Sequence, residues 1–568
     1  MYKKFTNPEY WTDMKTKPEY KIFIDGFKRI YNKCSKKTSI DFSEFTSYRD
    51  TGLREGSDGA YFERERYFHC CLFLSLIYPE EEKYIRELQE IIWAICNDFT
   101  WERAAHMEHM EDIEFQEIAL GGCAMAAKLA QTKLWLGERL DPVIRERIHA
   151  EIKRRYLVPY EKFTWGWETT KCNWAATCAG YMGIAFMLEF PDEFIKIKPK
   201  LENALEYFLD SFSKEGVCLE GVGYWAAIAH FAHYASCLLE FTEGNENYFK
   251  QERIHRIAKF LNNSYLKGNL CVSFSDCYPR TKTNYGNSHL LHSIYPDVKL
   301  LPDHCYEKDE EDIDRMITWW ELCEITMLYF NPEYLNQPVD ETNEETTYFA
   351  PDAGWYIYKG EKYALAAKGG HNDEPHNHND IGSFHLVTDS GQQLADFGPS
   401  LYTDKNFDNN YRYEIFANSS FGHSVPIIDG KGQIKGREFE GTIELTNDEV
   451  LIRSSKAYGN PELLSSERKL KCEKDYVRVF DSFRFDSGVH EITERFVTGL
   501  VPEIKDEAVS FGDISINVKS DNWTINIKGF EHISNSNITG TKSTVYAVDF
   551  TKTVDTSCEF EMKITVNL

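Results

Sequence analysis

The sequence lacks any long apolar run. No window approaches the roughly 18 uninterrupted apolar residues that a membrane helix needs, and hydrophobic residues make up 42% of the chain, an ordinary share for a soluble globular protein. The first 20 residues also lack the apolar core of a secretory signal, because two lysines are followed by polar, aromatic and proline residues. We therefore expect a soluble protein that is not exported, and hence a cytoplasmic one.

The sequence also lacks the cysteine pattern of a disulfide framework and a net positive charge. The 15 cysteines are odd in number and show no CxxC spacing, which fits reduced thiols better than a disulfide framework. With 64 basic and 91 acidic residues, the formal charge is −27. The negative electrostatic field of this charge repels nucleic acids and anionic membranes, so neither is expected as a partner. A local Arg/Lys cleft could still bind an anionic sugar. The oligomeric state is left open.

The length of 568 residues predicts at least two domains. From about residue 60 to 335, apolar residues recur at three- and four-residue spacing between Gly- and Asn-containing breaks, which predicts a helical-hairpin array. Residues 336–348 are acidic and polar and form the best linker candidate. After them, alternating β-branched and aromatic stretches predict a large antiparallel β-sandwich. We therefore expect an α+β multidomain chain with an α domain at 1–340 and a β domain at 341–568.

The segment 369–402, followed by residues 409–424, holds the densest group of candidate site residues. Its histidines are His371, His376, His378 and His385. If this stretch is a strand, His376 and His378 point to the same face and converge on one site. His378, Asp396 and His423 supply two nitrogen ligands and one oxygen ligand, a set suited to Zn²⁺ with water in the fourth place. Asp380 is a candidate to orient an imidazole. Solvated loop histidines fit the same pattern, so both interpretations stay open.

A specific resemblance favours the first interpretation. HNHND is followed by a strand-like stretch, by LADFG and by a tyrosine, which places the motif residues at His376, His378, Asp380, Gly391, Asp396, Gly398 and Tyr402. This resembles the H-x-H-x-D … G … D-x-G … Y segment of the heparinase II/III-like carbohydrate lyases. The resemblance implies an amino-terminal (α/α) toroid followed by an antiparallel β-sandwich. It also implies that His376 is catalytic and that His378, Asp396 and His423 hold a zinc ion.

Two further segments resemble the same family. Asn173 in KCNWAATCAG is similar to the helix-start asparagine that binds the substrate carboxylate, although Trp174 or Cys172 stands where some relatives carry a histidine. Tyr224, which lies 51 residues after Asn173, best matches the catalytic tyrosine. Trp174 is also a candidate for stacking on a sugar ring, with core packing as the alternative. Asn173 and Tyr224 occur together, in the same order as in the family, before the histidine motif, and this joint occurrence supports both assignments.

The remaining candidates are weaker. Tyr413, beside Arg412, is a candidate second catalytic tyrosine, and Arg412 a candidate substrate contact; the alternative is a strand with alternating faces. Arg280 and Glu220 are further candidate substrate contacts, against a solvated loop and helix packing as their alternatives.

These residue types suit β-elimination next to a uronate. Removal of the C5 proton builds charge on the carboxylate, which an amide such as that of Asn173 and an imidazolium would offset. Tyr224 is then the base, or base and acid in turn, and His376 the neutraliser or partner in proton transfer. We expect a lyase of glycosaminoglycan- or alginate-type oligosaccharides, exolytic because no export signal is seen. The alternatives are a glycoside hydrolase on an (α/α) scaffold, using two carboxylates, and a non-catalytic glycan-binding relative.

Overall fold

The computed structural model describes residues 3–111, 117–319, 346–505, 508–519, 522–536 and 539–568. The chain forms two compact units. Unit 1 consists of Met1–Ser211, Ala226–His255 and Thr283–Val339, and unit 2 of Phe212–Trp225, Arg256–Lys282 and Asp340–Leu568. The expected domain boundary between residues 340 and 341 lies one residue from the observed division between residues 339 and 340. Two segments of the expected helical domain, Phe212–Trp225 and Arg256–Lys282, nevertheless belong to unit 2. Of the expected linker, residues 336–345 lie outside the described residues and 346–348 begin a strand.

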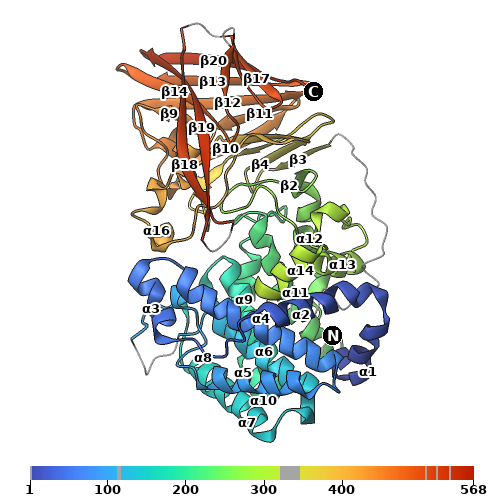
Figure 1. Ribbon diagram of the computed structural model, residues 1–568. Helices are drawn as coiled ribbons and strands as arrows, with labels where there is room; N and C mark the ends of the chain where they lie inside the picture. Colours follow the sequence, from blue (N-terminus) through green and yellow to red (C-terminus); the bar gives the residue numbers. More distant parts are fainter. Residues whose placement is uncertain (1–2, 112–116, 320–345, 506–507, 520–521, 537–538) are drawn as a thin grey trace. The chain divides into compact units, whose positions relative to one another are not determined.

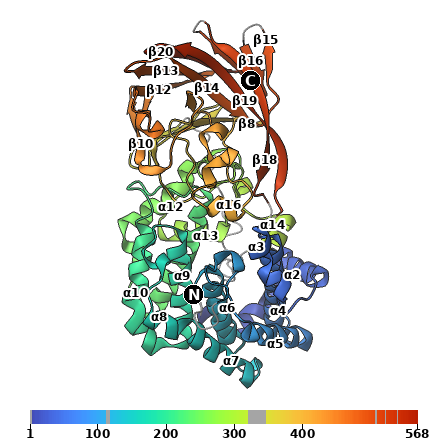
Figure 2. The ribbon, with the colours of Figure 1, turned by 90° about the vertical axis from the view of Figure 1, so that its left-hand side faces the viewer.

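Unit 1 is built from helices, labelled in Figures 1 and 2. They are α1 (Pro8–Asp13), α2 (Lys21–Lys33), α3 (Phe42–Thr51), α4 (Glu55–Ile77), α5 (Glu82–Asn97), α6 (Leu120–Leu136), α7 (Pro142–Ile152), α8 (Val158–Lys162), α9 (Asn173–Glu189), α10 (Pro191–Leu209), α11 (Ile228–Phe241), the first turn of α12 (Glu252–Ser264), α13 (Tyr285–Ile294) and α14 (Glu310–Trp319). No helix in the described ranges has both the length and the apolarity needed to cross a membrane.

The helices pair because their sequences provide two kinds of surface. Helix α2 is amphipathic and buries Phe23, Phe27 and Ile30 on one stripe. Helices α6 and α9 are buried nearly all round and pack against each other, and α9 also packs against α10 and α11. Gly183 makes the close approach of α9 to α11 possible, since a Cβ there would meet the Tyr234 ring at 2.4 Å. Paired helices of this kind are the building blocks of the expected (α/α) toroid.

Unit 2 is dominated by antiparallel sheets. Its strands are β1 (Tyr265–Lys267), β2 (Leu270–Cys271), β3 (Thr346–Ala350), β4 (Trp355–Lys359), β5 (Ala364–Lys368), β6 (Gly370–Asn372), β7 (Phe384–Thr388), β8 (Gly391–Leu394), β9 (Pro426–Ile428), β10 (Gly436–Thr446), β11 (Glu449–Arg453), β12 (Leu463–Glu473), β13 (Tyr476–Phe485), β14 (His490–Thr498), β15 (Glu503–Lys505), β16 (Ala508–Phe511), β17 (Ile514–Val518), β18 (Thr524–Ser534), β19 (Thr541–Val554) and β20 (Ser557–Val566). One short helix, α16 (Asp404–Phe407), follows β8.

Among the described residues, these strands form large sheets in the orders β15-β16-β17-β20-β13-β12-β11-β10-β6, β18-β19-β14-β9 and β3-β4-β5-β7-β8. Strands β12, β13 and β20 lie side by side in Figure 1. Along β13 and β20, buried and more exposed residues alternate, as one-faced burial requires. Apolar side chains from all of these sheets meet in a core cluster that includes Phe384, Phe496 and Phe560. Helices followed by antiparallel sheets confirm the expected fold class.

Buried aromatic rings explain why two segments of the helical half belong to unit 2. The Phe274 ring meets the Trp355 ring of β4 edge-on, with centroids 5.2 Å apart. The Trp225 indole N–H donates to the carbonyl of Ile257 at 2.9 Å. Tyr224, which the sequence analysis assigned to the toroid, is therefore part of unit 2, in the 3-10 helix Gly223–Ala227.

Candidate active site

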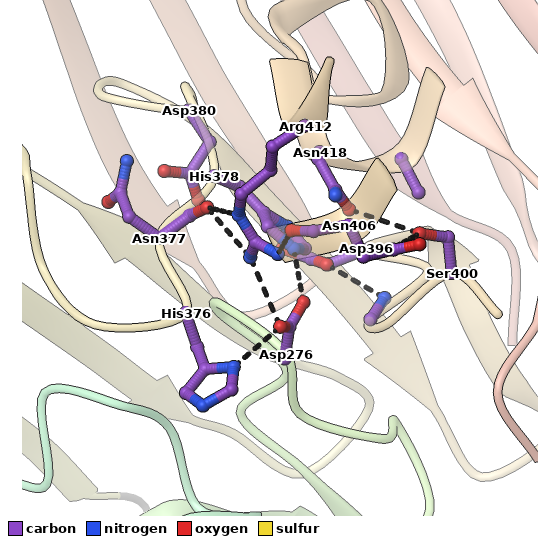
Figure 3. Close-up of polar contacts among 12 residues, drawn as sticks. Asp276, His376, Asn377, His378, Asp380, Asp396, Ser400, Asn406, Arg412 and Asn418 are labelled. Carbon is purple, nitrogen blue, oxygen red and sulfur yellow. Dashed lines mark hydrogen bonds and ion pairs between the residues drawn. The ribbon is translucent and has the colours of Figure 1, made fainter. Parts of the chain in front are cut away.

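Separate segments of unit 2 bring polar side chains together around Asp276, and Figure 3 shows His376 and Arg412 bonded to it. The first two segments are the loop that carries Glu220 and Tyr224 and the loop after β2 that carries Asp276, and a third is the turn after β6 that carries His376. Gly221, at φ +106°, lets the first two loops lie in contact, because a Cβ there would lie 2.8 Å from the carbonyl oxygen of Phe274.

A second glycine plays the same part for the D-x-G motif. Gly398 has φ +65°, and a Cβ on it would lie 2.2 Å from the carbonyl oxygen of Cys277. Only glycine fits this close backbone approach. It brings the segment that carries Asp396 and Tyr402 against the Asp276 loop.

His376 and His378 converge, but not through the expected strand geometry. His376 lies in a turn with φ +59°, a left-handed conformation that is uncommon for a residue with a side chain and that recurs at functional sites. Both imidazoles instead contact one carboxylate from a distant segment. The Nδ1 of His376 lies 2.8 Å from Oδ2 of Asp276, and the Nε2 of His378 lies 2.9 Å from Oδ1 (Figure 3).

Asp276 is ionised and nearly inaccessible. Its side chain is 1% exposed. Burial acts to raise its pKa, but the Arg412 guanidinium, at 3.1 Å, and the hydrogen bonds from both histidines outweigh burial and hold the pKa well below its usual range. Because a carboxylate only accepts, the two histidines donate to it, His376 through Nδ1–H and His378 through Nε2–H. Burial also lowers the pKa of His378, so the other nitrogen of that ring, Nδ1, keeps its lone pair.

Tyr224 faces the same group. Its ring stacks on the His376 ring, with centroids 4.1 Å apart. Its hydroxyl lies 2.7 Å from that of Tyr402, which donates to Asp276 at 3.0 Å. Burial, and secondarily the charge of Asp276, raise the pKa of Tyr224 well above 10, so the phenol is neutral. The buried Glu220 carboxylate lies 4.0 Å from the Nε2 of His376.

His378, Asp396 and His423 form a compact buried cluster whose potential ligand atoms all lie within 4.8 Å of one another. The Nε2 of His423 donates to the carbonyl of Ala417 at 2.9 Å, and its Nδ1 lies 3.6 Å from Oδ2 of Asp396. Burial acts to lower the pKa of His423, but the Asp396 carboxylate outweighs burial and raises the pKa, so a metal at Nδ1 would displace a proton. Burial lowers the pKa of His378, which favours the neutral imidazole that a metal needs.

The cluster therefore fits Zn²⁺. The Nδ1 of His378 and the Oδ2 of Asp396 are buried and make no hydrogen bond within the described part of the chain. Two nitrogen donors and one carboxylate oxygen match a zinc site that keeps a position for water. Outer contacts to the imidazoles come from Asp276 and the Ala417 carbonyl. Asp380, expected in that role, instead pairs with Lys368 at 2.6 Å, because the buried ammonium needs a counter-charge.

The other predicted residues are placed differently. Asn173 begins helix α9 in unit 1, and the half-buried Trp174 meets the His106 ring edge-on at 5.2 Å. The contact of Asn173 with the unit 2 site stays a prediction. Exposed Arg280 donates to Asn269 at 2.7 Å, at the β1–β2 hairpin.

Arg412 and Tyr413 lie in a 3-10 helix, Arg412–Glu414, and not in a strand. The Arg412 guanidinium is buried and donates to Asp276 and to the carbonyls of Asn377 and Asn406. These bonds hold the guanidinium inside the protein, and the expected contact of Arg412 with substrate stays a prediction. Tyr413 is half-buried beside it.

Sequence reasoning missed Asp276. It lies in SDCYPRTK, where Arg280 was selected, and 100 residues separate it from His376. Its only local signal is a single aspartate between apolar and small residues. Tyr402 was recognised as part of the motif but was given no role, although it joins Tyr224 to Asp276.

Comparisons with known proteins agree with this architecture. Residues 343–554 match the family model described as Heparinase II/III-like, C-terminal. The resemblance indicated by the histidine motif is therefore confirmed for the C-terminal part of the chain. No curated protein matches the sequence.

Several solved structures share the fold over most of the chain. Heparinase III is similar with a TM-score of 0.62 at 14% identity, covering 90% of this chain and 78% of its own. A heparan sulfate lyase from Pedobacter heparinus gives a TM-score of 0.57 at 13% identity, covering 96% and 87%. The chondroitin AC lyase of Streptomyces coelicolor A3, in complex with chondroitin sulphate, gives 0.56 at 9% identity, covering 100% and 83%. At these identities the similarity shows the fold.

Proposed function

We propose that this chain is a polysaccharide lyase that cleaves uronic-acid-containing glycans by β-elimination. The observation that carries the proposal is the stacked pair of Tyr224 and His376, whose polar atoms are held by Tyr402 and Asp276. Elimination needs a base at C5 and an acid at the departing C4 oxygen, and one contact joins two groups able to fill these roles. The matching family model and the lyase fold support it.

The hydrogen bonds divide the proton-transfer roles. Since Asp276 accepts from Nδ1–H of His376, Nε2 is the ring atom left to receive the C5 proton. Tyr224 rests as a neutral phenol, which suits it to protonate the leaving oxygen. The alternative, in which Tyr224 serves as base and acid in turn, requires its proton to leave first. We favour His376 as the base and Tyr224 as the acid.

Charge on the uronate carboxylate grows as the C5 proton leaves, and donors aimed at it lower the barrier. We assign this task to the Asn173 amide at the start of α9, where the helix dipole also favours an anion. Glu220, buried beside His376, would repel that carboxylate if it lay close, so we place Glu220 behind the imidazole and not at the substrate.

His378, Asp396 and His423 would hold a zinc ion, which when bound would supply a fixed positive charge and tie together the three segments that carry these residues. The chain's own groups perform the proton transfers. The substrate class of the proposal is a glycosaminoglycan- or alginate-type uronate oligosaccharide, attacked from one end.

The test is a panel of uronate oligosaccharides followed by ultraviolet absorbance. Elimination leaves a C4–C5 double bond conjugated to the carboxylate, which absorbs, whereas hydrolysis by two carboxylates or simple binding does not. Release of one product size from the start of the reaction would support exolytic action. Cleavage without the ultraviolet chromophore would contradict the lyase proposal and favour a glycoside hydrolase.

A further inference from the structure

Asp276 touches two functional groups at once, and its two oxygens divide the contacts. Oδ1 accepts from His378, a member of the metal cluster. Oδ2 accepts from His376, from the hydroxyl of Tyr402 and from Arg412. Figure 3 shows the carboxylate between the two imidazoles. The metal cluster and the proton-transfer residues are thus joined through one planar group.

We propose that Asp276 is a positioning residue that couples the metal cluster to the proton-transfer pair. The proposal rests on the proposed function and goes beyond it. A carboxylate is rigid, so a rotation that follows a movement of His378 at Oδ1 must also move the acceptor for His376 and Tyr402 at Oδ2. Through Asp276, His378 held by a bound metal would fix the direction of the His376 ring.

The surroundings of Asp276 make this coupling strong. Its side chain is 1% exposed, so bulk water does not compete for its oxygens. Arg412 donates both to Asp276 and to the carbonyl of Asn377, the residue between the two histidines. The backbone of His376 is held at φ +59°, a conformation that persists only when its surroundings fix it. Loss of one partner therefore releases the others.

The first test uses Asp276→Asn, which keeps the shape but leaves an NH₂ facing either His378 at Oδ1 or the three donors at Oδ2. Zinc affinity, measured by chelator competition without substrate, should fall about 10–100-fold. Turnover should fall about 10²-fold or more with little change in KM. The matched control is Asp549→Asn, because Asp549 is also a buried aspartate of unit 2 but is held, within the described part of the chain, by Arg495, with two bonds of 2.7 Å. It should lower stability and leave zinc affinity and kcat unchanged.

Asp276→Glu serves if the asparagine variant does not fold, because it keeps the charge beside Arg412 and displaces the carboxylate by one methylene. It should show the same paired losses. Unchanged zinc affinity in either folded variant would overturn the proposal.

The decisive measurement crosses the substitution with metal removal. Chelation should lower kcat of the natural protein strongly but lower that of Asp276→Asn little further, because the coupling is already broken. Independent, additive losses would overturn the proposal. In ¹⁵N-histidine spectra, where His376→Gln identifies the His376 signal, zinc removal should shift that signal only when Asp276 is present. The spectra and zinc affinities decide the coupling even if no substrate yields the ultraviolet product, an outcome that would refute only the proposed function.

Discussion

The hydroxyl of Tyr224 donates to the hydroxyl of Tyr402, 2.7 Å away, and does not accept from it. The direction follows from Asp276, because the carboxylate takes the proton of Tyr402 at 3.0 Å and leaves the Tyr402 oxygen to accept. Tyr224 therefore rests with its proton in place, and burial, the main cause of its raised pKa, keeps the phenol neutral. This arrangement favours the acid role of Tyr224 and leaves the first proton abstraction to His376.

Tyr224→Phe removes the donor and keeps the ring that stacks on His376. We expect turnover to fall about 10²–10⁴-fold, the usual contribution of a general acid or base, while the melting temperature changes little. Steady-state kinetics by ultraviolet absorbance checks this.

The control is Tyr363→Phe, which removes a hydroxyl that donates to the carbonyl of Glu473 at 2.7 Å in the core of unit 2. It should lower stability and leave kcat unchanged. Near-normal turnover of Tyr224→Phe would instead make Tyr413 the next candidate.

The sequence predicted the order of the two folds because periodicity is a local signal: 3.6-residue spacing gives way to alternation near residue 346. It did not predict that Tyr224 belongs to the sheet unit. That membership depends on where the rings of Trp225 and Phe274 are buried, and an apolar residue in a helical pattern does not reveal its partner.

The site was predictable where its residues belong to segments that resemble a known motif. The H-x-H-x-D and D-x-G motifs identified His376, His378 and Asp396, but the strand assumed for them was wrong because His376 adopts a left-handed turn. Asp276 contacts both histidines from 100 and 102 residues away. Such a contact is fixed by close backbone approaches at Gly221 and Gly398, which only the folded chain reveals.

The metal cluster predicts about one zinc per chain, by the usual preference of such a ligand set. His378→Ala should abolish this content and lower the melting temperature, because a metal bound only by the folded state stabilises it. Elemental analysis of unchelated protein measures it. His385→Asn is the control, since His385 is also buried in the same histidine-rich segment but is not a member of the cluster. Full zinc content in His378→Ala would refute the ligand assignment.

Asn173→Ala should lower kcat about 10²-fold or more with a smaller effect on KM, because its amide would stabilise charge that grows in the transition state. Asn173→Asp should be worse, since it directs a negative charge toward the substrate carboxylate at nearly unchanged volume. Kinetics of both variants on the same oligosaccharide checks the order. Equal activity of the two variants would argue that Asn173 does not face the carboxylate.

Glu102 predicts a pH dependence of stability in unit 1. Its buried carboxylate accepts from the backbone N–H groups of Ala119 and Gly122, at 2.9 and 2.8 Å, at the start of α6. Burial outweighs these donors and raises its pKa from 4.5 to about 7. A carboxyl group with a raised pKa binds its proton more tightly in the folded state, so its contribution is fully present below pH 4.5 and is lost as the pH rises to 7.

The loss from this single group is about 3 kcal/mol of unfolding free energy between pH 4.5 and 7, at roughly 1.4 kcal/mol per pH unit. Glu102→Gln cannot ionise, so it should lack this decline while being less stable at pH 5, where an amide NH₂ faces one of the two backbone donors. Urea-induced unfolding of both proteins at pH 5 and 8 measures this contribution. Every other titrating group is present in both proteins, so the difference between their changes in unfolding free energy comes from Glu102. If the two proteins lose stability in parallel over this interval, Glu102 is ionised in the folded protein and its carboxylate caps α6 as a charge.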